Sequence, residues 1–90
     1  MILRYSEQSI RDLKKFEHND RQLTVKKLEY LEKNFETLKN SKKITQLKGS
    51  KFKDQYRYIV ARKIRVLFRL EDDKIVILIL RVGLRKEIYR

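Results

Sequence analysis

Cysteine is absent from this 90-residue sequence, and histidine occurs only once. Without cysteine there is no disulfide and no thiolate to bind a metal, and a lone histidine cannot form a ligand cluster. We therefore expect no metal and no cofactor, and we interpret His18 as a surface histidine in a loop between two helices. The absence of disulfides fits a reducing compartment, so we expect a cytoplasmic protein.

Long apolar runs are also missing. The longest, Ile75 to Leu80, is far shorter than the roughly 20 residues that a membrane-spanning helix needs. The first residues, MILRYSEQ, are charged at Arg4 and have no apolar core long enough for a signal peptide. There is no repeat, no linker and no low-complexity segment. We expect a single domain, residues 1–90, that buries about 60–65% of the surface of the unfolded chain.

Acidic residues are scarce in the middle of the chain. Lys and Arg outnumber Asp and Glu by 24 to 12, which gives a formal net charge of +12. Residues 39–65 carry ten basic residues against Asp54 alone, a net +9, and residues 81–90 carry a net +3. Residues 1–38 are nearly balanced at +1, and residues 66–80 sum to −1. A positive block beside apolar strands predicts a nucleic acid or an acidic protein as partner, rather than an evenly charged solvated surface.

The first half of the chain predicts a short strand and two helices. The apolar start, Met1 to Tyr5, has the character of a strand. Ser6 is suited to cap one helix, and Asn19 or Asp20 to cap a second one that ends at the KNSKK segment. Apolar residues recur at spacings of three and four, so each helix has one apolar face. These residues are Ile10, Leu13 and Phe16 in the first helix, and Leu23, Leu28, Leu31, Phe35 and Leu38 in the second.

From Gln55 onward the apolar residues alternate with a period of two, which predicts strands. The acidic segment EDD, Glu71 to Asp73, marks a turn, and Ile75 to Leu80 reads as a strand buried on both faces. The inward-facing positions of the first two strands are Tyr56, Tyr58, Val60, Ile64, Val66, Phe68 and Leu70. The order β-α-α-β-β-β predicts an α+β fold, in which a helical hairpin packs on one face of an antiparallel sheet with an N-terminal strand.

The same alternation predicts where the arginines point. Arg57 and Arg65 lie between inward-facing residues on neighbouring strands, so they project from the face opposite the helices. Gly83 is expected to end the last strand and to let the chain turn, which brings Arg85 and Tyr89 back towards that face. An arginine-lined sheet with an aromatic ring beside it is suited to binding a phosphate backbone and stacking a base.

Two segments of the second half resemble a known family. LKGSKFKDQYRYIVARKIRVLFRL (Leu47 to Leu70) and ILRVGLRKEIYR (Ile79 to Arg90) contain an LKG turn, a YR strand, an RV strand with an aromatic residue, and a closing VG-x-R…Y. This pattern resembles the RelE/ParE superfamily of bacterial toxins from toxin–antitoxin pairs. The order and length of the expected elements are similar to that family over essentially the whole chain.

The resemblance to the RelE branch implies a ribosome-dependent mRNA endonuclease, an mRNA interferase that inhibits translation and arrests growth. It implies that Arg57, Arg65, Arg85 and Tyr89 are the catalytic residues, and that Tyr89 stacks on or orients the substrate. Arg65 and Arg85 are assigned to stabilising the phosphate under attack. Attack by the RNA's own 2′-OH needs alignment and charge neutralisation, but no metal. Further basic residues are expected to bind the RNA, and these are Lys48, Lys51, Lys53, Lys63, Arg81 and Lys86.

Two positions depart from the family pattern. Ile59 stands where relatives have a second basic residue that is thought to act as general base, and Leu84 stands where many have a histidine. The general base is therefore not identified, and Lys51, Lys53 or Lys63 could supply it.

Two other functions stay open. A ParE-like toxin of the same fold would inhibit DNA gyrase and cleave nothing, although that branch generally lacks the arginine–tyrosine ending. A RelE fold that has lost its catalytic activity would only bind its antitoxin or ribosomal RNA. The resemblance implies a cognate acidic antitoxin with a disordered segment that folds as it wraps the toxin. For the nuclease it also implies mRNA on the ribosome as a partner.

Overall fold

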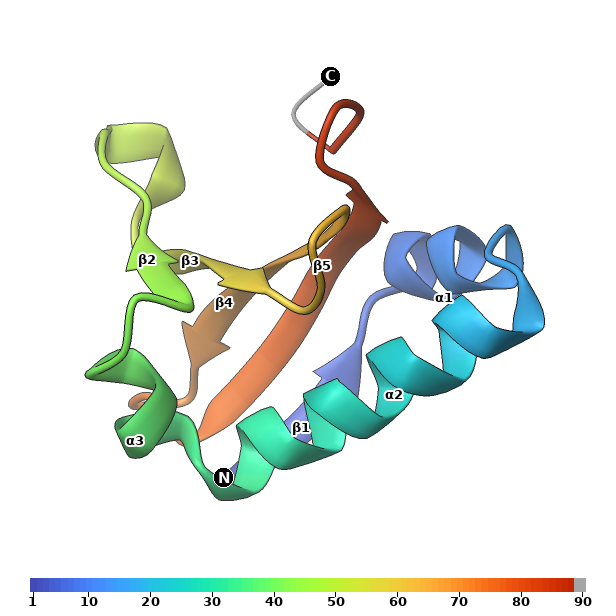
Figure 1. Ribbon diagram of the computed structural model, residues 1–90. Coiled ribbons are helices and arrows are strands. Elements are labelled where there is room, and N and C mark those ends of the chain that lie inside the picture. Colours follow the sequence, from blue (N-terminus) through green and yellow to red (C-terminus); the bar gives the residue numbers. More distant parts are fainter. Residues whose placement is uncertain (89–90) are drawn as a thin grey trace.

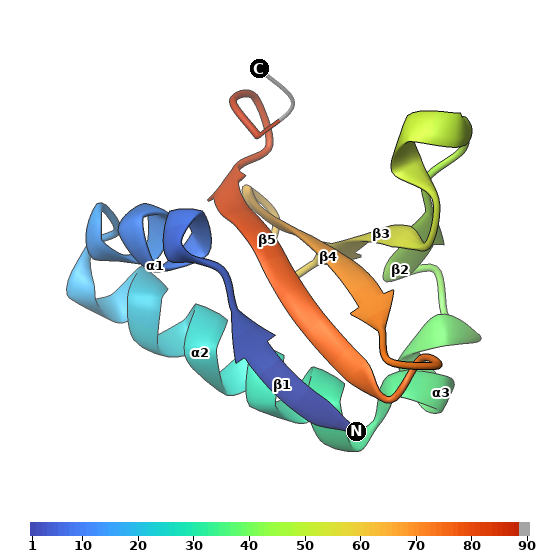
Figure 2. The same cartoon turned by 180° about the vertical axis from the view of Figure 1, so that it is seen from behind.

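The computed structural model describes residues 1–88, apart from the side chain of Ser50. Five strands form one sheet, and the helices pack against one of its faces (Figure 1). Figure 2 shows β1, β5 and β4 from the side that none of the described helices covers. Across the sheet the strands lie in the order β1 (Ile2–Tyr5), β5 (Val76–Leu84), β4 (Ile64–Glu71), β3 (Gln55–Ile59) and β2 (Ile44–Gln46). The helices are α1 (Glu7–Lys14), α2 (His18–Lys33) and α3 (Phe35–Lys39), and a 3₁₀ turn (Ser50–Phe52) lies between β2 and β3.

The predicted α+β fold is confirmed, with one correction to the sheet. The strands from β2 to β5 are antiparallel neighbours, but β1 runs parallel to β5 at the edge. A tight hairpin makes its two strands antiparallel, whereas β1 and β5 are separated by most of the chain and have no such constraint. The Ile2 amide donates to the Ile75 carbonyl (2.8 Å) and the Ser6 amide to the Ile79 carbonyl (2.9 Å). The sequence does not predict β2, because three residues are too few to show an alternation.

The first helix begins at the predicted cap. The Ser6 Oγ accepts a hydrogen bond from the Ser9 amide (3.0 Å) and donates one to the Leu80 carbonyl (3.0 Å). The cap therefore starts α1 and also ties it to β5. Within residues 1–88, no helix is both long and apolar enough to cross a membrane.

The second helix begins earlier than predicted. The expectation that Asn19 or Asp20 caps it is wrong, because α2 starts at His18 with Glu17 in the cap position. Asp20 instead lies in the first turn, where the helix dipole favours a carboxylate. His18 is exposed, as expected, but it opens α2 rather than lying in a loop.

Not every apolar residue of the predicted helix faces is buried. Ile10 is 43% exposed and Leu23 is 38% exposed, whereas the neighbouring Ser9 and Thr24 are fully buried. Both hydroxyls are satisfied there, since each donates to a backbone carbonyl of the preceding turn at 2.8 Å. A local hydrogen bond thus lets a small polar residue take the inward position.

The inward-facing strand positions form the core, as predicted. The Phe35 ring lies edge-on to Tyr56 and to Phe68, with centroids 6.1 Å apart in both pairs, and Tyr56 stacks on Phe68 at 5.3 Å. Burial raises the pKa of the Tyr58 hydroxyl, and neighbouring Tyr30 adds to this shift. The other core residues of the sheet region are Ile44, Val60 directly after β3, Ile64, Val66, Leu70, Ile77, Ile79 and Val82.

The last strand is longer than predicted and does not end at Gly83. β5 runs from Val76 through Gly83 to Leu84, and the chain turns only afterwards. The amides of Glu87 and Ile88 donate to the Leu84 carbonyl (2.9 and 3.1 Å). Ile88 is buried above Gly83, where a Cβ would lie 3.5 Å from the Cβ of Ile88. Gly83 is therefore an extended residue beneath the C-terminal turn rather than the turn itself.

Positive backbone φ angles mark two other turns. Gly49 has a φ of +108° at the start of the 3₁₀ turn. Asp72, Asp73 and Lys74 have φ angles of 48°, 53° and 71° in the predicted turn between β4 and β5. Short polar side chains such as aspartate tolerate this left-handed region better than most residues.

One buried carboxylate fastens α1 to the end of the sheet. Asp12, which is 5% exposed, accepts hydrogen bonds from Arg81 Nε, the Val82 amide and Gln8 Nε2, each at 2.9 Å. Burial alone would raise the Asp12 pKa, but the hydrogen bonds from Arg81, Val82 and Gln8 outweigh it and the pKa lies below its usual 3.8. The carboxylate thus holds β5 directly before the C-terminal turn.

We expect Asp12→Ala to lower the free energy of unfolding at pH 7 by about 2 kcal/mol, because a charged side chain and a buried amide lose their acceptor. A carboxylate with a lowered pKa stabilises the fold above its unfolded pKa, and this contribution is lost as the pH falls through the folded pKa. The difference in the free energy of unfolding between wild type and Asp12→Ala should therefore become smaller below a pH of about 3.8.

Urea unfolding between pH 3 and pH 7 measures this gap. Glu7→Ala is the control, because Glu7 is an exposed first-turn carboxylate whose pair with Arg11 (3.9 Å) and interaction with the helix dipole should together contribute less than about 1 kcal/mol. A gap for Asp12→Ala that stays constant with pH would contradict the proposed contribution of the carboxylate.

The two glycines should respond differently to the same added methyl group. Gly49→Ala should lower the free energy of unfolding by about 1 kcal/mol or more, because its φ of +108° is strained for any residue with a Cβ. Gly83→Ala should change it by less than about 0.5 kcal/mol, since the new Cβ makes only an ordinary contact with Ile88. Thermal unfolding of both variants checks this, and the reverse order of stability would show that the turn at Gly49 is assigned wrongly.

Candidate nucleic-acid interface

Three of the predicted site arginines meet at one hollow. Arg57, Arg65 and Arg85, together with Ile59, line an open hollow of about 360 Å³. Ile59 and Arg65 are direct partners across β3 and β4. The Arg85 amide donates to the Lys63 carbonyl (2.8 Å), which ties the end of β5 to the turn between β3 and β4. The structure thus brings together side chains from three separate parts of the chain.

Arg65 is held by the backbone of the β3–β4 turn. The residue is only 9% exposed, and its Nη1 donates to the carbonyls of Ala61 (2.7 Å), Arg62 (3.1 Å) and Ile64 (3.1 Å). Arg65 lies on the predicted face of the sheet, but it is buried rather than projecting into solvent. It therefore shapes the turn to which the Arg85 backbone is attached.

Arg57 presents an unsatisfied donor. Its Nε is buried and has no hydrogen-bond partner among residues 1–88, and its Nη2 lies 3.5 Å from the Thr45 Oγ1, at the outer limit of a hydrogen bond. A buried N–H without a partner costs about 1–3 kcal/mol. The outer nitrogens of the guanidinium are suited to an anion bound in the hollow, because a guanidinium donates to carboxylate or phosphate oxygens in pairs.

Arg85 is exposed at the start of the C-terminal turn. Its backbone is fixed to the β3–β4 turn, while the buried Ile88 holds the far side of the same turn. A long, flexible side chain therefore starts from a rigid position beside the hollow. The fourth predicted catalytic residue, Tyr89, lies outside the described residues.

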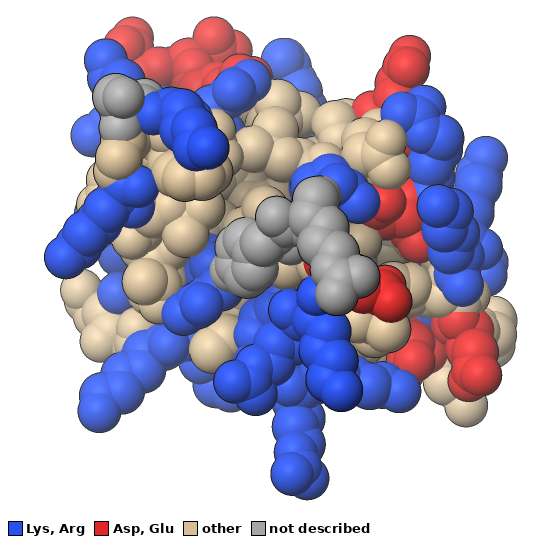
Figure 3. All heavy atoms as spheres, turned by 90° about the horizontal axis from the view of Figure 1, so that it is seen from above, with Lys and Arg blue, Asp and Glu red and all other residues tan. Residues whose placement is uncertain are grey.

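Basic side chains surround this end of the molecule. Figure 3 looks onto it and shows Lys and Arg side chains gathered over the surface. Five of the predicted RNA-binding lysines are exposed: Lys48, Lys51 and Lys53 between β2 and β3, Lys63 after β3, and Lys86 after β5. Of these, Lys63 has an acidic neighbour, since its Nζ lies 3.6 Å from the Asp20 carboxylate. An extended polyanion could run across the remaining lysines into the hollow.

Arg81 is placed differently from the other predicted RNA-binding residues. Its guanidinium is paired with Asp12, and Arg81 does not line the hollow. Its charge is already balanced within the fold. Arg81 is therefore better explained by the attachment of α1 to β5 than by contact with RNA.

The described lining of the hollow contains guanidinium groups and one aliphatic side chain. The predicted candidates for a general base, Lys51, Lys53 and Lys63, do not belong to that lining. Within residues 1–88, no group of three or more His, Cys, Asp or Glu side chains could hold a metal ion. The arrangement is suited to binding and stabilising negative charge.

Sequence reasoning misses one neighbour of the site. Thr45 on β2 lies beside the Arg57 guanidinium, and the two residues are partners across β2 and β3. A three-residue strand leaves no periodic signal that could have placed Thr45 there. Ile59, which the sequence marks only as a departure from a family pattern, supplies the aliphatic part of the lining.

Comparison with known proteins identifies the family. A family model described as "ParE toxin of type II toxin-antitoxin system, parDE" matches residues 3–89. A comparison with curated proteins finds no match.

Solved structures share the fold. The toxin–antitoxin complex RelBE2 from Mycobacterium tuberculosis is similar at a TM-score of 0.75 and 20% identity, over 93% of this chain and 96% of that one. The archaeal RelE–RelB complex from Pyrococcus horikoshii is similar at a TM-score of 0.71 and 19% identity, over 96% of both chains. The intact E. coli RelBE complex is similar at a TM-score of 0.66 and 20% identity, over 91% of this chain and 93% of that one.

At these identities the solved structures support the fold, while the family model covers nearly the whole chain. The resemblance noted from the LKG and VG-x-R…Y segments is thereby confirmed. The chain belongs to the family of ParE toxins of type II toxin–antitoxin systems, within the RelE/ParE superfamily.

Proposed function

We propose that this toxin cleaves messenger RNA on the ribosome and so inhibits translation in the cytoplasm. The observation that carries the proposal is the hollow in which Arg57, Arg65 and Arg85 converge. Arg57 adds to it, because its Nη2 has only a 3.5 Å contact with the Thr45 Oγ1 and is suited to donate to a phosphate oxygen. A phosphodiester backbone can also reach the surrounding lysines, which a small anion cannot do.

In the proposed reaction, the 2′-oxygen of one nucleotide attacks the adjacent phosphorus. The 2′-OH loses its proton to a base, the bond between O2′ and phosphorus forms and the bond between phosphorus and O5′ breaks. This leaves a 2′,3′-cyclic phosphate and, once O5′ takes a proton from solvent, a 5′-hydroxyl. Negative charge grows on the phosphate oxygens as the fifth bond forms, and the three guanidinium groups, of which Arg65 is held by the turn carbonyls, would stabilise that charge. This route requires no metal, because the arginines supply the charge neutralisation.

Proton transfer is assigned to groups other than these arginines. An arginine side chain stays protonated and therefore cannot accept a proton as a base. Arg57, Arg65 and Arg85 are thus assigned to charge stabilisation. Lys51, Lys53 and Lys63 remain the proposed sources of a base, and each would have to reach the 2′-OH from outside the described lining. Tyr89 is proposed to stack on the base next to the cleaved bond.

An acidic antitoxin is the proposed protein partner. The net charge of +12 requires neutralisation by any protein that covers the basic end of the molecule. The similar structures from M. tuberculosis, P. horikoshii and E. coli are complexes of a toxin with an antitoxin, which supports the same arrangement for this chain.

Inhibition of DNA gyrase without cleavage is the second candidate function. The description of the matching family as ParE toxins favours it, as does the presence of Ile59 and Leu84 at two positions where nucleases of this fold have basic residues or histidine. Two assays separate the candidates: primer extension on messenger incubated with programmed ribosomes, and supercoiling by purified gyrase. The proposal expects new messenger ends and unaffected supercoiling, and the opposite pair of results would replace it with the ParE-like function.

Substitutions of the three arginines should affect the cleavage rate and the free energy of unfolding differently. Arg57→Met should slow cleavage by about 10²-fold or more, while the free energy of unfolding stays equal or rises, because an unsatisfied buried donor is removed. Arg85→Ala should slow cleavage similarly and change stability by less than about 0.5 kcal/mol, since the side chain is exposed. Arg65→Ala should lower the free energy of unfolding by about 1–3 kcal/mol as well, because three turn carbonyls lose their donor.

Cleavage rates on programmed ribosomes and urea unfolding measure the two properties. Arg4→Ala is the matched control, because Arg4 is an exposed strand arginine on β1 at the other edge of the sheet. Arg4→Ala should leave both properties unchanged. Wild-type cleavage by Arg57→Met or by Arg85→Ala would remove the hollow from the proposed active site.

A further inference from the structure

A second cavity lies where α2 gives way to α3. Asn34 separates the two helices with a φ of −130° and a ψ of 32°, and both its amide and its Nδ2 donate to the Tyr30 carbonyl (2.9 and 3.0 Å). These bonds end α2 and change the direction of the chain. Phe35, directly after the break, is only 5% exposed and packs against the aromatic residues of the sheet.

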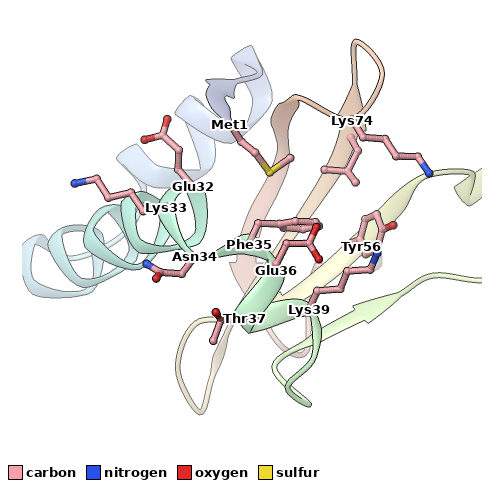
Figure 4. A pocket seen from close by; sticks show the side chains of 11 residues that line it. Met1, Glu32, Lys33, Asn34, Phe35, Glu36, Thr37, Lys39, Tyr56 and Lys74 are labelled. Atoms are coloured by element: carbon pink, nitrogen blue, oxygen red, sulfur yellow. The ribbon is translucent and has the colours of Figure 1, made fainter.

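The cavity has an apolar floor and a charged rim. It measures about 390 Å³, and the buried side chains of Phe35, Tyr56 and Leu70 form its floor. Lys39 and Lys74 stand on its rim, and Figure 4 shows both amines reaching towards the side on which the Tyr56 hydroxyl lies. A volume of this size is enough for one or two apolar side chains of a partner.

The charge on the rim is uneven. On the opposite side from these amines, Glu32 already accepts a hydrogen bond from the Leu3 amide (3.0 Å). Neither Lys39 nor Lys74 forms an ion pair with any residue that the structure describes. Beside Tyr56 the cavity therefore offers an apolar slot next to two ammonium groups that form no described ion pair, with the Glu36 carboxylate on the same side (Figure 4).

This cavity is remote from the arginine hollow. Leu70 and Lys74 lie at the β4–β5 turn, whereas Arg65 and Arg85 lie at the opposite ends of the same two strands. Along β4 alone the distance from Arg65 to Leu70 is about 17 Å. In Figure 1, α3 and the β4–β5 turn lie at the bottom, and the C-terminal turn lies at the top.

We propose that this cavity is a second anchor for the antitoxin, which inserts an apolar side chain with a carboxylate beside it. The inference rests on the proposed antitoxin partner but not on messenger cleavage. RNA is a poor occupant, because the cavity has an aromatic and aliphatic floor and lies at the opposite end of β4 and β5 from the arginine hollow. An acidic protein fits both parts: buried apolar anchors supply most of the affinity of protein interfaces, and the lysines favour a nearby carboxylate.

Two separate attachments have a functional consequence. When one segment of the antitoxin is anchored at the cavity, the segment that covers the hollow is held at a high local concentration. Loss of the anchor should therefore weaken inhibition without changing the hollow. A toxin with a damaged cavity remains active and escapes its antitoxin.

The test reverses the charge on the rim and compares it with a matched reversal elsewhere. Lys39→Glu/Lys74→Glu should weaken binding of the purified antitoxin, the product of the reading frame beside the toxin gene, by about tenfold or more. Lys27→Glu/Lys42→Glu is the control: it makes the same change in net charge at two exposed lysines that line neither the cavity nor the hollow. This control should weaken binding by less than about threefold. Glu36→Lys, which removes a rim carboxylate, should strengthen binding.

Calorimetry with full-length proteins measures the affinities, and thermal unfolding verifies that each variant is folded. Equal losses for the two double variants would mean that only general charge attraction is at work, and this would overturn the anchor, as would no loss at all. The toxin activity of Lys39→Glu/Lys74→Glu without antitoxin should equal that of the wild type. Failure of the wild type to cleave messenger would contradict the proposed function and leave the anchor standing, whereas failure of the wild type to bind the antitoxin would contradict the anchor.

Discussion

The position of the C-terminal end of β5 decides whether a site exists in this protein. That end is held on one side by the Asp12 carboxylate of α1, which accepts hydrogen bonds from Arg81 and from the Val82 amide. On the other side, the Lys63 carbonyl in the β3–β4 turn accepts the amide that follows β5. Arg65 holds this turn in shape. Through these bonds α1, β4 and β5 share one fixed corner, and the arginine hollow lies on it.

High positive charge in a small domain is the second constraint. The sequence has twenty-four basic and only twelve acidic side chains, so the excess positive charges repel one another. This repulsion lowers the stability of the folded protein. The shortage of acidic partners is also seen at Arg57, whose buried Nε has no hydrogen-bond partner among the described residues. In the proposed function, a bound polyanion would reduce this repulsion, so part of its binding free energy would come from charges that are unfavourably placed in the free protein.

The two cavities divide the proposed roles between the two ends of the sheet. The hollow has arginines and little apolar surface, which suits a substrate that binds by charge and must leave after cleavage. The cavity at the α2–α3 break has an aromatic floor and a rim that includes three lysines and two glutamates, which suits a protein partner that stays bound. If the proposed roles hold, the separation along β4 and β5 would allow inhibition and catalysis to be changed by different residues.

Local patterns in the sequence determine much of this protein. The period-two alternation places Tyr56 and Tyr58 inside and Arg57 on the opposite face, and the structure confirms this because alternation depends only on the geometry of a strand. The same holds for the Ser6 cap, whose hydrogen bond to the Ser9 amide joins residues three positions apart. The LKG and VG-x-R…Y segments are also local, and they are sufficient to indicate the superfamily to which the chain belongs.

Contacts between distant residues are decided only by the tertiary structure. The direction of β1, the pairing of Arg81 with Asp12 and the burial of Arg65 against its turn leave no periodic trace in the sequence. Arg81 and Asp12 are 69 positions apart, and nothing local to either residue specifies the partner. The cavity floor likewise joins residues from α3, β3 and β4. Local periodicity says which face of an element is apolar, but only the packed sheet determines which faces and which charges meet.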